Sequence, residues 1–291
     1  GCERGQLQAA YFANATQGHM EGQHMVRGQL ALRAMGVGGI PVVNVENACA
    51  SASTALHLAV QHVRSGAADL VLAVGAEKMV SEDKGRMFAA FDGAWDVHDT
   101  EASQERLLRM GQGVTPPEGS QSPRPYSVFM DIYAAMGRMH MQQFGTTQRQ
   151  FAAVAAKNHE HSVHNPLAQY RQAMTIEQVL AAPPISYPLT LPMCSPVSDG
   201  AAAAIVCNEA GLKRLQGRRD RAVRVLACVL QTGSDRAADA LQEHLVHRAA
   251  QRLYEQAGVG AADVSVAEVH DATAIGEVLQ SELLGLVAWG Q

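Results

Sequence analysis

The sequence predicts an α/β protein whose sheet is covered by helices. Residues 40–45 form a β-branched run of strand length, and residues 51–65 carry apolar side chains at helical spacing. Another apolar run at 70–74 follows a Ser-Gly helix stop, so the three segments make a β-α-β unit. Aromatic residues make up only 5% of the chain, which suits close packing of helices on a sheet. We therefore expect parallel strands with helices on both faces.

Composition and charge exclude several classes of protein. A chain of 291 residues that is 47% hydrophobic can bury one large core or two domain-sized cores. The net charge of -5 gives no basic field, so nucleic acid is not an expected partner. The five cysteines are scattered without a C-x-x-C pair, which fits a reducing, cytoplasmic location. No apolar run reaches the roughly 18 residues of a membrane span, so no membrane partner is expected.

The flanks of this β-α-β unit extend the same architecture. Residues 6–15 read as a strand, residues 18–22 as a loop, and residues 26–35 as a helix closed by Gly36. The glycines between 36 and 39 precede a strand and do not open a helix, so they do not form a phosphate-binding loop.

Residues 81–192 predict a mostly helical insertion, because prolines interrupt the segment and its apolar residues have helical spacing. The expected helices cover 131–144, 147–162 and 175–181, with no strand pattern between them. Residues 201–207 then form a short apolar run of buried-strand type.

A second β-α-β unit is expected to begin at residue 221. Its predicted elements are a strand at 223–230, a helix at 238–257, a strand at 264–269 and a helix at 275–284. Since the chain stops at Gln291, we expect this second sheet to be incomplete.

Cys49 is the main candidate for catalysis, because it lies in the turn between the strand at 40–45 and the helix at 51–65. A thiol there is close to free backbone N–H groups and to the positive end of the helix dipole, which both favour the thiolate. Such a thiolate can serve as a nucleophile. The alternative is that Cys49 is a small buried apolar residue.

Five segments resemble, in order, successive landmarks of the thiolase superfamily. They read NVENACASASTAL from Asn44, GAEKM from Gly75, KNHEHS from Lys157, SDGAAA from Ser198 and EVHD from Glu268. The branch that they resemble most is that of the thiolases linked to sterol carrier protein and of acetyl-CoA acetyltransferase-like proteins. Relative to this family the chain is expected to be truncated at both ends.

The resemblance implies two similar halves, each with a five-stranded mixed sheet, stacked in α-β-α-β-α layers with a loop domain inserted in the first half. The implied divisions are the N-terminal half without its opening strand (1–80), the helical loop domain (81–192), the return of the N-terminal half (193–220) and an incomplete C-terminal half (221–291).

The resemblance also implies an acyltransferase. Cys49 is similar to the cysteine that accepts an acyl group from a CoA thioester, for Claisen condensation or for thiolysis, and its own N–H would help to bind the oxyanion. The CoA thioester is the substrate, and no separate cofactor is expected. The expected assembly is a homodimer, with a small OB-fold or zinc-ribbon protein as a further partner in some relatives.

His270 resembles the histidine of the branch's His-Asp-Cys-Phe motif, which implies that it binds the thioester oxygen. We expect it to close a strand and project into a cleft; the alternative is a core histidine. Asp271 is expected to orient neighbouring groups, while Glu277 and Glu282 are expected to be interface or solvent residues.

Ala272 departs from the motif, since a Cys with an acid/base role is usual at this position. The family's Gly-His-Pro and final Cys-x-Gly segments are also absent from the sequence. Two alternatives to a plain thiolase stay open for this reason. One is a diverted enzyme for polyketide-like C-acylation or sterol side-chain cleavage, and the other is a non-catalytic acyl-CoA-binding subunit.

The remaining candidates have simpler interpretations. No metal site is expected, because His159 and His161 cannot share a helix face. Cys194 and Cys207 are expected to fill core space. Four methionines could line an acyl pocket but are more typical of core (Met130, Met136, Met139 and Met141). Four arginines could bind CoA phosphates, and no choice among them is made (Arg86, Arg106, Arg109 and Arg138).

Overall fold

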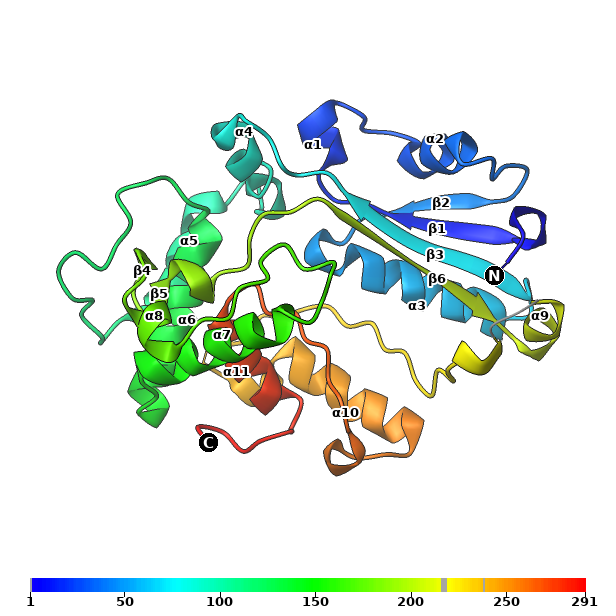
Figure 1. Ribbon diagram of the computed structural model, residues 1–291. Coiled ribbons are helices and arrows are strands. Elements are labelled where there is room, and N and C mark those ends of the chain that lie inside the picture. The colour runs from blue at the N-terminus through cyan, green and yellow to red at the C-terminus, as the bar shows by residue number, and fades with distance from the viewer. Residues whose placement is uncertain (1, 216–218, 238) are drawn as a thin grey trace. The chain divides into compact units, whose positions relative to one another are not determined.

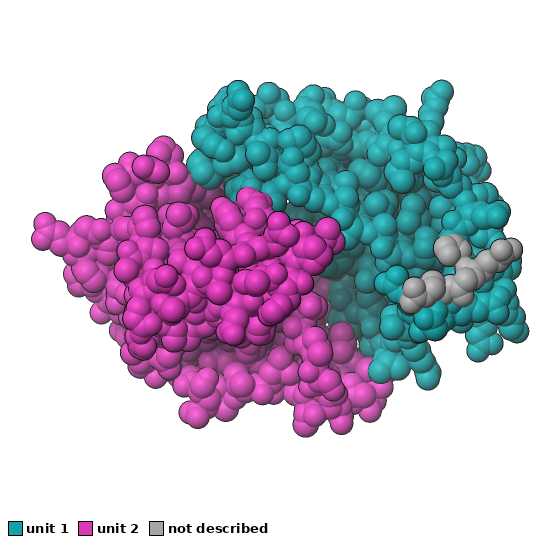
Figure 2. Space-filling view, in the orientation of Figure 1, with its two compact units in different colours: residues 1–94, 197–230 teal, residues 95–196, 231–291 magenta. Residues whose placement is uncertain are grey.

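The structure is a computed structural model that describes residues 2–215, 219–237 and 239–291 (Figure 1). The chain forms two compact units, each described here by itself (Figure 2). Unit 1 contains residues 1–94 and 197–230, and unit 2 contains residues 95–196 and 231–291. The division into thiolase halves and a loop domain stays a prediction.

Unit 1 is built on a four-stranded mixed sheet in the order β2-β1-β3-β6. Its strands are β1 (Ala9–Ala13), β2 (Val42–Val45), β3 (Leu70–Glu77) and β6 (Gly200–Cys207). Strand β1 is parallel to β2 and β3, whereas β6 is antiparallel to β3. The α/β class and the mixed sheet expected from the sequence are thereby confirmed.

Helices cover both faces of this sheet because successive strand residues point to opposite sides (Figure 1). Helix α3 (Ser51–Arg64) lies on one face and helix α2 (Arg27–Ala34) on the other. The core beneath α3 consists of Ala9, Ala59, Val63, Ala68, Val71 and Ala73. The core beneath α2 consists of Leu7, Ala10, Leu32, Val37 and Leu72.

Two expectations for unit 1 are wrong. Residues 18–22 were expected as a loop, but α1 (Gln17–Glu21) is a short helix. Strand β6 was expected to be buried, yet its first residues are exposed, and Ile205 is 39% exposed. The reason is that β6 lies at the edge of the described sheet and pairs only with β3. The apolar pattern of a strand indicates the chemistry of its side chains. It does not indicate which neighbouring elements cover the strand.

The other helices of unit 1 are α4 (Lys84–Ala89) and α9 (Glu209–Arg214).

Unit 2 is mainly helical. Its helices are α5 (Thr100–Leu108), α6 (Val128–Phe144), α7 (Gln148–Ser162), α8 (Ile176–Leu180), α10 (Leu245–Ala257) and α11 (Ala274–Leu283). The three helices expected in the insertion are confirmed as α6, α7 and α8. A small hairpin of β4 (Pro184–Ser186) and β5 (Leu189–Thr190) was not expected. Strands of two and three residues are too short for a period to be read from the sequence.

The core of unit 2 joins α6, α7 and α11. Its buried residues are Ala134, Phe151, Ala152, Ala155, Val179, Leu189, Met193, Ala274, Ile275, Leu279 and Leu283. Met139 is buried, and Met136 and Met141 pack against this core, so these three methionines are core residues. Among the described residues, no helix is long and apolar enough to cross a membrane.

The second β-α-β unit expected from residue 221 does not form in the described ranges. Residues 223–230 and 264–269 are irregular, and Val223 and Val266 are 88% and 80% exposed. A β-prone run becomes a strand only when a neighbour satisfies its backbone groups, and neither run pairs with a strand in this structure. The expected helix at 238–257 begins instead at Leu245, and residue 238 itself lies outside the described residues.

Candidate functional site

Cys49 lies where the sequence places it, in a 3₁₀ turn (Ala48–Ala50) between β2 and α3. The cysteine is exposed. Ala48, directly before it, has φ 45°, which is in the left-handed region that residues with a side chain rarely adopt. A tight turn of this kind presents the Cys49 side chain at the start of α3.

Polar side chains on both sides of Cys49 hold this turn. Ser51 Oγ donates to the Ala48 carbonyl at 2.6 Å and accepts from the Asn47 N–H at 2.8 Å. Asn47 Nδ2 in turn donates to Thr54 Oγ1 at 2.9 Å. The side chains of Ser51 and Thr54 are buried, so water competes little for these bonds. Side chains in the first turn of α3 therefore hold the 3₁₀ turn that contains Cys49 in place.

Gly75 brings this helix close to the sheet. A Cβ added at Gly75 would lie 2.9 Å from the Cβ of Ala52, which is in the first turn of α3. Real Cβ atoms do not approach so closely, so only glycine permits the observed spacing between β3 and the helix that follows Cys49. Gly75 thus positions the turn although it lies 26 residues away in sequence.

The electrostatics of Cys49 differ from the sequence-based expectation. Desolvation raises the pKa of the thiol above its ordinary value, its own backbone N–H opposes that change, and the negative charge of Glu77 adds to it. The helix terminus was expected to lower the pKa of Cys49 and so to favour the thiolate. That expectation is wrong, because the net change in the pKa is upward. Acylation of this thiol requires that a base accept its proton.

Glu77 is held at the end of β3 by a cluster of donors. Its carboxylate accepts from Asn14 Nδ2 at 2.9 Å, from the Ala15 N–H at 2.9 Å, and from the Thr16 N–H and hydroxyl at 3.0 and 2.5 Å. These bonds tie β3 to the segment that follows β1. They also keep the negative charge at a fixed place relative to Cys49 within unit 1.

His270 belongs to unit 2, and its side chain is exposed. It was expected to close a strand, but residues 265–272 are irregular, as described above. Its backbone carbonyl accepts a hydrogen bond from Gln280 Nε2 of α11, so the next helix anchors the segment. Cys49 and His270 thus come from different units, and their catalytic roles stay predictions.

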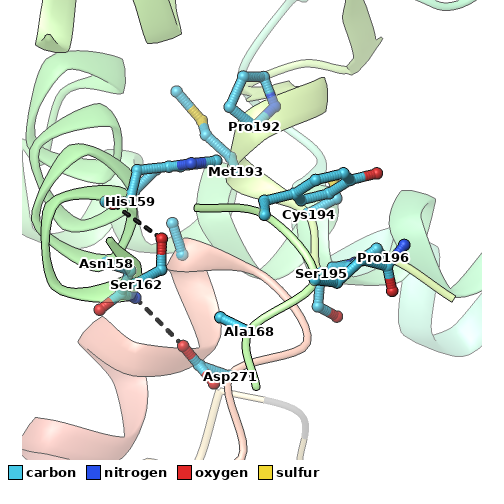
Figure 3. A pocket seen from close by; sticks show the side chains of 14 residues that line it. Asn158, His159, Ser162, Ala168, Pro192, Met193, Cys194, Ser195, Pro196 and Asp271 are labelled. Carbon is cyan, nitrogen blue, oxygen red and sulfur yellow. Dashed lines mark hydrogen bonds between the residues drawn. The ribbon is translucent and has the colours of Figure 1, made fainter. Parts of the chain in front are cut away.

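Asp271, the residue after His270, lines a pocket of about 230 Å³ (Figure 3). It lies wholly within unit 2, between α7, the 192–196 segment and the start of α11. Its lining comprises Ala155, Asn158, His159, Ser162, Ala168, Gln169, Tyr170, Pro192, Met193, Cys194, Ser195, Pro196, Asp271 and Ala274.

A polar network forms one corner of this pocket. Asn158 Nδ2 donates to Asp271 Oδ2 at 3.2 Å and to Glu277 Oε2 at 2.8 Å, as Figure 3 shows for Asp271. Glu277 also pairs with Lys157. Desolvation, partly offset by its own backbone N–H, and the nearby Glu277 charge raise the pKa of Asp271. Glu277, expected to be a solvent or interface residue, is thus part of this network.

The wall opposite α7 is a pair of extended segments. Cys194 forms an isolated β-bridge with Thr273, and the Ser195 N–H donates to the Ala272 carbonyl at 3.0 Å. Burial raises the pKa of the Cys194 thiol to about 12, so this cysteine is protonated at neutral pH. Cys194 packs against the core of unit 2, as expected, and it also lines the pocket.

The other candidates are tied to structural partners. Glu282 was expected to face solvent or an interface, but it is 2% exposed and bonded to His140. Arg86, Arg109 and Arg138 each donate to protein oxygens. In the described ranges, no group of three or more His, Cys, Asp or Glu residues could hold a metal ion.

Sequence reasoning singled out the segment that contains Asn158 but not its role. The KNHEHS motif served as a family landmark and assigned no role to Asn158, because Asp271, the partner of Asn158, is 113 residues further along the chain. No sequence pattern identified Tyr170 as a candidate site residue. Only the packing of α7 against α11 brings these groups to one pocket.

Known relatives cover much of the chain. It is 32% identical over 290 residues to the benzoylsuccinyl-CoA thiolase subunit BbsB of Thauera aromatica, covering 98% of this chain and 66% of that protein. It is 35% identical over 273 residues to sterol carrier protein 2 of Homo sapiens, covering 91% and 47%. It is 34% identical over 297 residues to acetyl-CoA acetyltransferase of Methanothermobacter thermautotrophicus, covering 100% and 70%. The chain thus spans only part of the length of each relative.

A solved structure and two family models support the same relationship as these relatives. The solved structure of the Ltp2-ChsH2(DUF35) aldolase has a TM-score of 0.69 and 21% identity, covering 99% of this chain and 68% of that chain, which is a likeness of fold. Residues 1–182 match the family described as thiolase, N-terminal domain, and residues 230–291 match thiolase C-terminal domain-like. The resemblance seen in the motifs is confirmed, and the chain belongs to the thiolase family.

Proposed function

We propose that this protein is a thiolase-type acyltransferase that handles CoA thioesters through an acyl-Cys49 intermediate. The observation that carries the proposal is the exposed Cys49 in the rigid turn between β2 and α3. Membership of the thiolase family supports it, since two of the relatives are named as a thiolase subunit and an acetyl-CoA acetyltransferase.

The chemistry suits a cysteine. The sulfur of Cys49 attacks the thioester carbonyl carbon, the bond from that carbon to the CoA sulfur breaks, and CoA leaves as a thiol with the proton that Cys49 gives up. The acyl group stays in a thioester, so its energy is retained for transfer to an enolate or back to CoA. Because desolvation and Glu77 raise the pKa of Cys49, the proton must pass to a base during the attack.

His270 is proposed to bind the thioester oxygen and to stabilise the charge that develops there. Its exposed side chain on an irregular segment, anchored by Gln280, supports a role toward a ligand better than a role in the core. Substitution of His270 by Ala is expected to slow acylation without changing the fold.

A second candidate function is favoured by Ala272. An Ala at the motif position that resembles a proton-carrying Cys favours a diverted enzyme that forms or breaks a different carbon–carbon bond, such as C-acylation of a polyketide-like acceptor or cleavage of a sterol side chain. A methyl group cannot carry a proton, so ordinary thiolysis would be slow. A non-catalytic acyl-CoA-binding subunit would bind CoA thioesters without acylating Cys49.

We also propose that the protein works in the cytoplasm as a homodimer, with a small OB-fold or zinc-ribbon protein as a second component. The solved neighbour named Ltp2-ChsH2(DUF35) motivates a search for such a component. Size-exclusion chromatography with light scattering on the full-length protein tests the dimer, and a monomer would contradict it.

The acylation test uses the full-length protein. Incubation with acetyl-CoA, followed by protease digestion and mass spectrometry, should place an acetyl group on the peptide that contains Cys49 and release free CoA. Cys49→Ser is expected to abolish the release of CoA. Label on Cys194 or Cys207 with Cys49 unmodified would contradict the proposal.

A further inference from the structure

The two serines that line the pocket of unit 2 act as hydrogen-bond acceptors toward it. Ser162 Oγ donates its proton to the His159 carbonyl at 2.8 Å, a bond that Figure 3 shows beside the pocket. Ser195 Oγ donates its proton to the Ala272 carbonyl at 3.1 Å. A hydroxyl group has one proton, so each of these oxygens has only lone pairs left for a ligand.

Asn158 and His159, which also line the pocket, add further acceptors. The Nδ2 amino group of Asn158 donates to Asp271 and to Glu277, so both of its protons are used and its Oδ1 remains to accept. His159 Nδ1 lies 3.2 Å from the Gln172 carbonyl. Because a carbonyl can only accept, Nδ1 carries the proton, and Nε2 of the neutral ring is an acceptor.

The charge at this corner of the pocket is negative. Glu277 is paired with Lys157, and Asp271 is the second carboxylate beside them, so two carboxylates face one ammonium group. Desolvation is the largest cause of the raised pKa of Asp271, and Glu277 adds to it, whereas the charges of His270 and Lys157 act in the opposite direction. The Asp271 carboxylate therefore lacks part of the stabilisation that water or a cation gives an exposed carboxylate.

The apolar part of the pocket suits a compact body. Small or compact side chains contribute to it, among them Ala155, Ala168 and Met193. An engineered cavity of about 150 Å³ binds benzene, so a six-membered ring with one short substituent fits the 230 Å³ of this pocket. The Tyr170 ring is 54% exposed and lies nearly parallel to the His159 ring, with 6.5 Å between centroids and 20° between planes. The face of an aromatic ring attracts a cation.

We propose that this pocket binds a small organic ammonium ion, that is, a compact apolar body with a protonated primary amine, and that Asp271 is its charged partner. An ammonium group brings three donors and a positive charge to a lining rich in acceptors and negative charge. An alcohol brings one donor and no charge, and a carboxylate brings neither. Gln169, the other polar side chain of the lining, has both donors and acceptors and suits either kind of ligand. The inference concerns unit 2 alone and does not depend on the chemistry proposed for Cys49.

The test compares three probes of similar size and different charge. The full-length protein is titrated at neutral pH with benzylamine, benzyl alcohol and benzoate, and binding is followed by ligand-observed nuclear magnetic resonance. The same titrations are made with Asp271→Asn, which keeps an oxygen acceptor for Asn158 but has no charge, and with Ala168→Phe, which fills the pocket from a loop. Leu167→Phe is the matched control, because Leu167 is the neighbouring residue, lies outside the pocket lining and is 91% exposed.

We expect benzylamine to bind about tenfold more tightly than benzyl alcohol, because a hydrogen bond between charged groups contributes about that factor over a neutral one. Benzoate should bind more weakly than either, since its charge is repelled by Asp271. Asp271→Asn should remove the preference for benzylamine over benzyl alcohol, and Ala168→Phe should weaken both of these ligands about tenfold. Leu167→Phe should change none of the three affinities.

Three results would overturn the inference. The first is equal binding of benzylamine and benzyl alcohol, or tighter binding of benzoate. The second is undiminished binding of benzylamine by Ala168→Phe or by Asp271→Asn, because the cation would then be held at another carboxylate of the surface. The third is that none of the probes binds up to its limit of solubility. Acetylation of Cys49 in the unsubstituted protein is measured separately, so the proposed function stands or fails independently of these results.

Discussion

His140 Nε2 lies 2.9 Å from Glu282 Oε1 and 3.0 Å from Glu282 Oε2, and the two side chains are 2% and 0% exposed. His140 Nδ1 is 2.7 Å from Thr146 Oγ1, and the Gly290 N–H donates to Glu282 Oε1 at 2.8 Å. The pair therefore connects α6, α11 and the last residues of the chain through groups that have no access to water.

Loss of one member of this pair should destabilise unit 2 strongly. His140→Leu removes the donor and leaves the buried Glu282 carboxylate without its main partner, so the free energy of unfolding should fall by about 3–5 kcal/mol. Urea denaturation followed by circular dichroism measures this change. The control is Arg109→Gln, which breaks the exposed pair with Glu105 and should cost less than about 1 kcal/mol. Similar values for the two variants would show that the buried pair is not a stabilising contact.

Gly75→Ala should disturb the turn that holds Cys49. The new methyl group would meet the Cβ of Ala52 at 2.9 Å and push the first turn of α3 away from β3. We expect a loss of about 1–3 kcal/mol in stability and about 10- to 100-fold slower acylation of Cys49. Gly200→Ala is the matched control on β6, because nothing lies within 4 Å of its added Cβ. Acylation at the normal rate in Gly75→Ala would refute the positioning role.

Glu77→Gln should make the Cys49 thiol more acidic. The Glu77 charge raises the pKa of Cys49, so its removal lowers that pKa and increases the thiolate fraction at any pH below it. The rate of alkylation by iodoacetamide, measured against pH, should show a midpoint at lower pH than in the unsubstituted protein. Glu82→Gln, an exposed neighbour, should leave the profile unchanged. A midpoint that moves to higher pH would contradict the electrostatic argument.

Asp199 should contribute to the pH dependence of stability. Its carboxylate pairs with Lys78 and accepts the N–H groups of Met79 and Val80. The Lys78 side chain is the largest cause of a pKa lowered to about 2 from 3.8. Because the folded-state pKa is depressed, the stabilisation is present above the ordinary pKa and is lost as the pH falls toward 2. The stability difference between the unsubstituted protein and Asp199→Asn should therefore shrink in this window, and a constant difference would contradict the prediction.

Ala272→Cys tests the second candidate function. If a thiol at this position carries the proton at the substrate α-carbon, its introduction should raise thiolysis of acetoacetyl-CoA by the full-length protein about 10²- to 10⁴-fold. The rate of acetylation of Cys49 should change little. Rapid thiolysis by the unsubstituted protein would instead favour a plain thiolase.

The elements around Cys49 could be predicted because their signals are local. The β-branched run at 40–45, the helical spacing at 51–65 and the small residues between them each depend on residues near in sequence, and β2, the turn and α3 formed there. The motif order also identified the family. The strands expected at 223–230 and 264–269 did not form. A strand requires a pairing partner, and no local sequence pattern indicates whether that partner is present.

The sequence by itself determined the α/β class, the position of Cys49 and the helical nature of residues 131–144 and 147–162. Only the tertiary structure decided which distant groups meet: Gly75 with Ala52, Asn158 with Asp271 and His140 with Glu282. It also reversed the expected direction of the Cys49 pKa, because desolvation depends on the atoms that surround the sulfur. Periodicity and capping act within one or two turns of chain, whereas burial and electrostatic contacts are set by packing between elements.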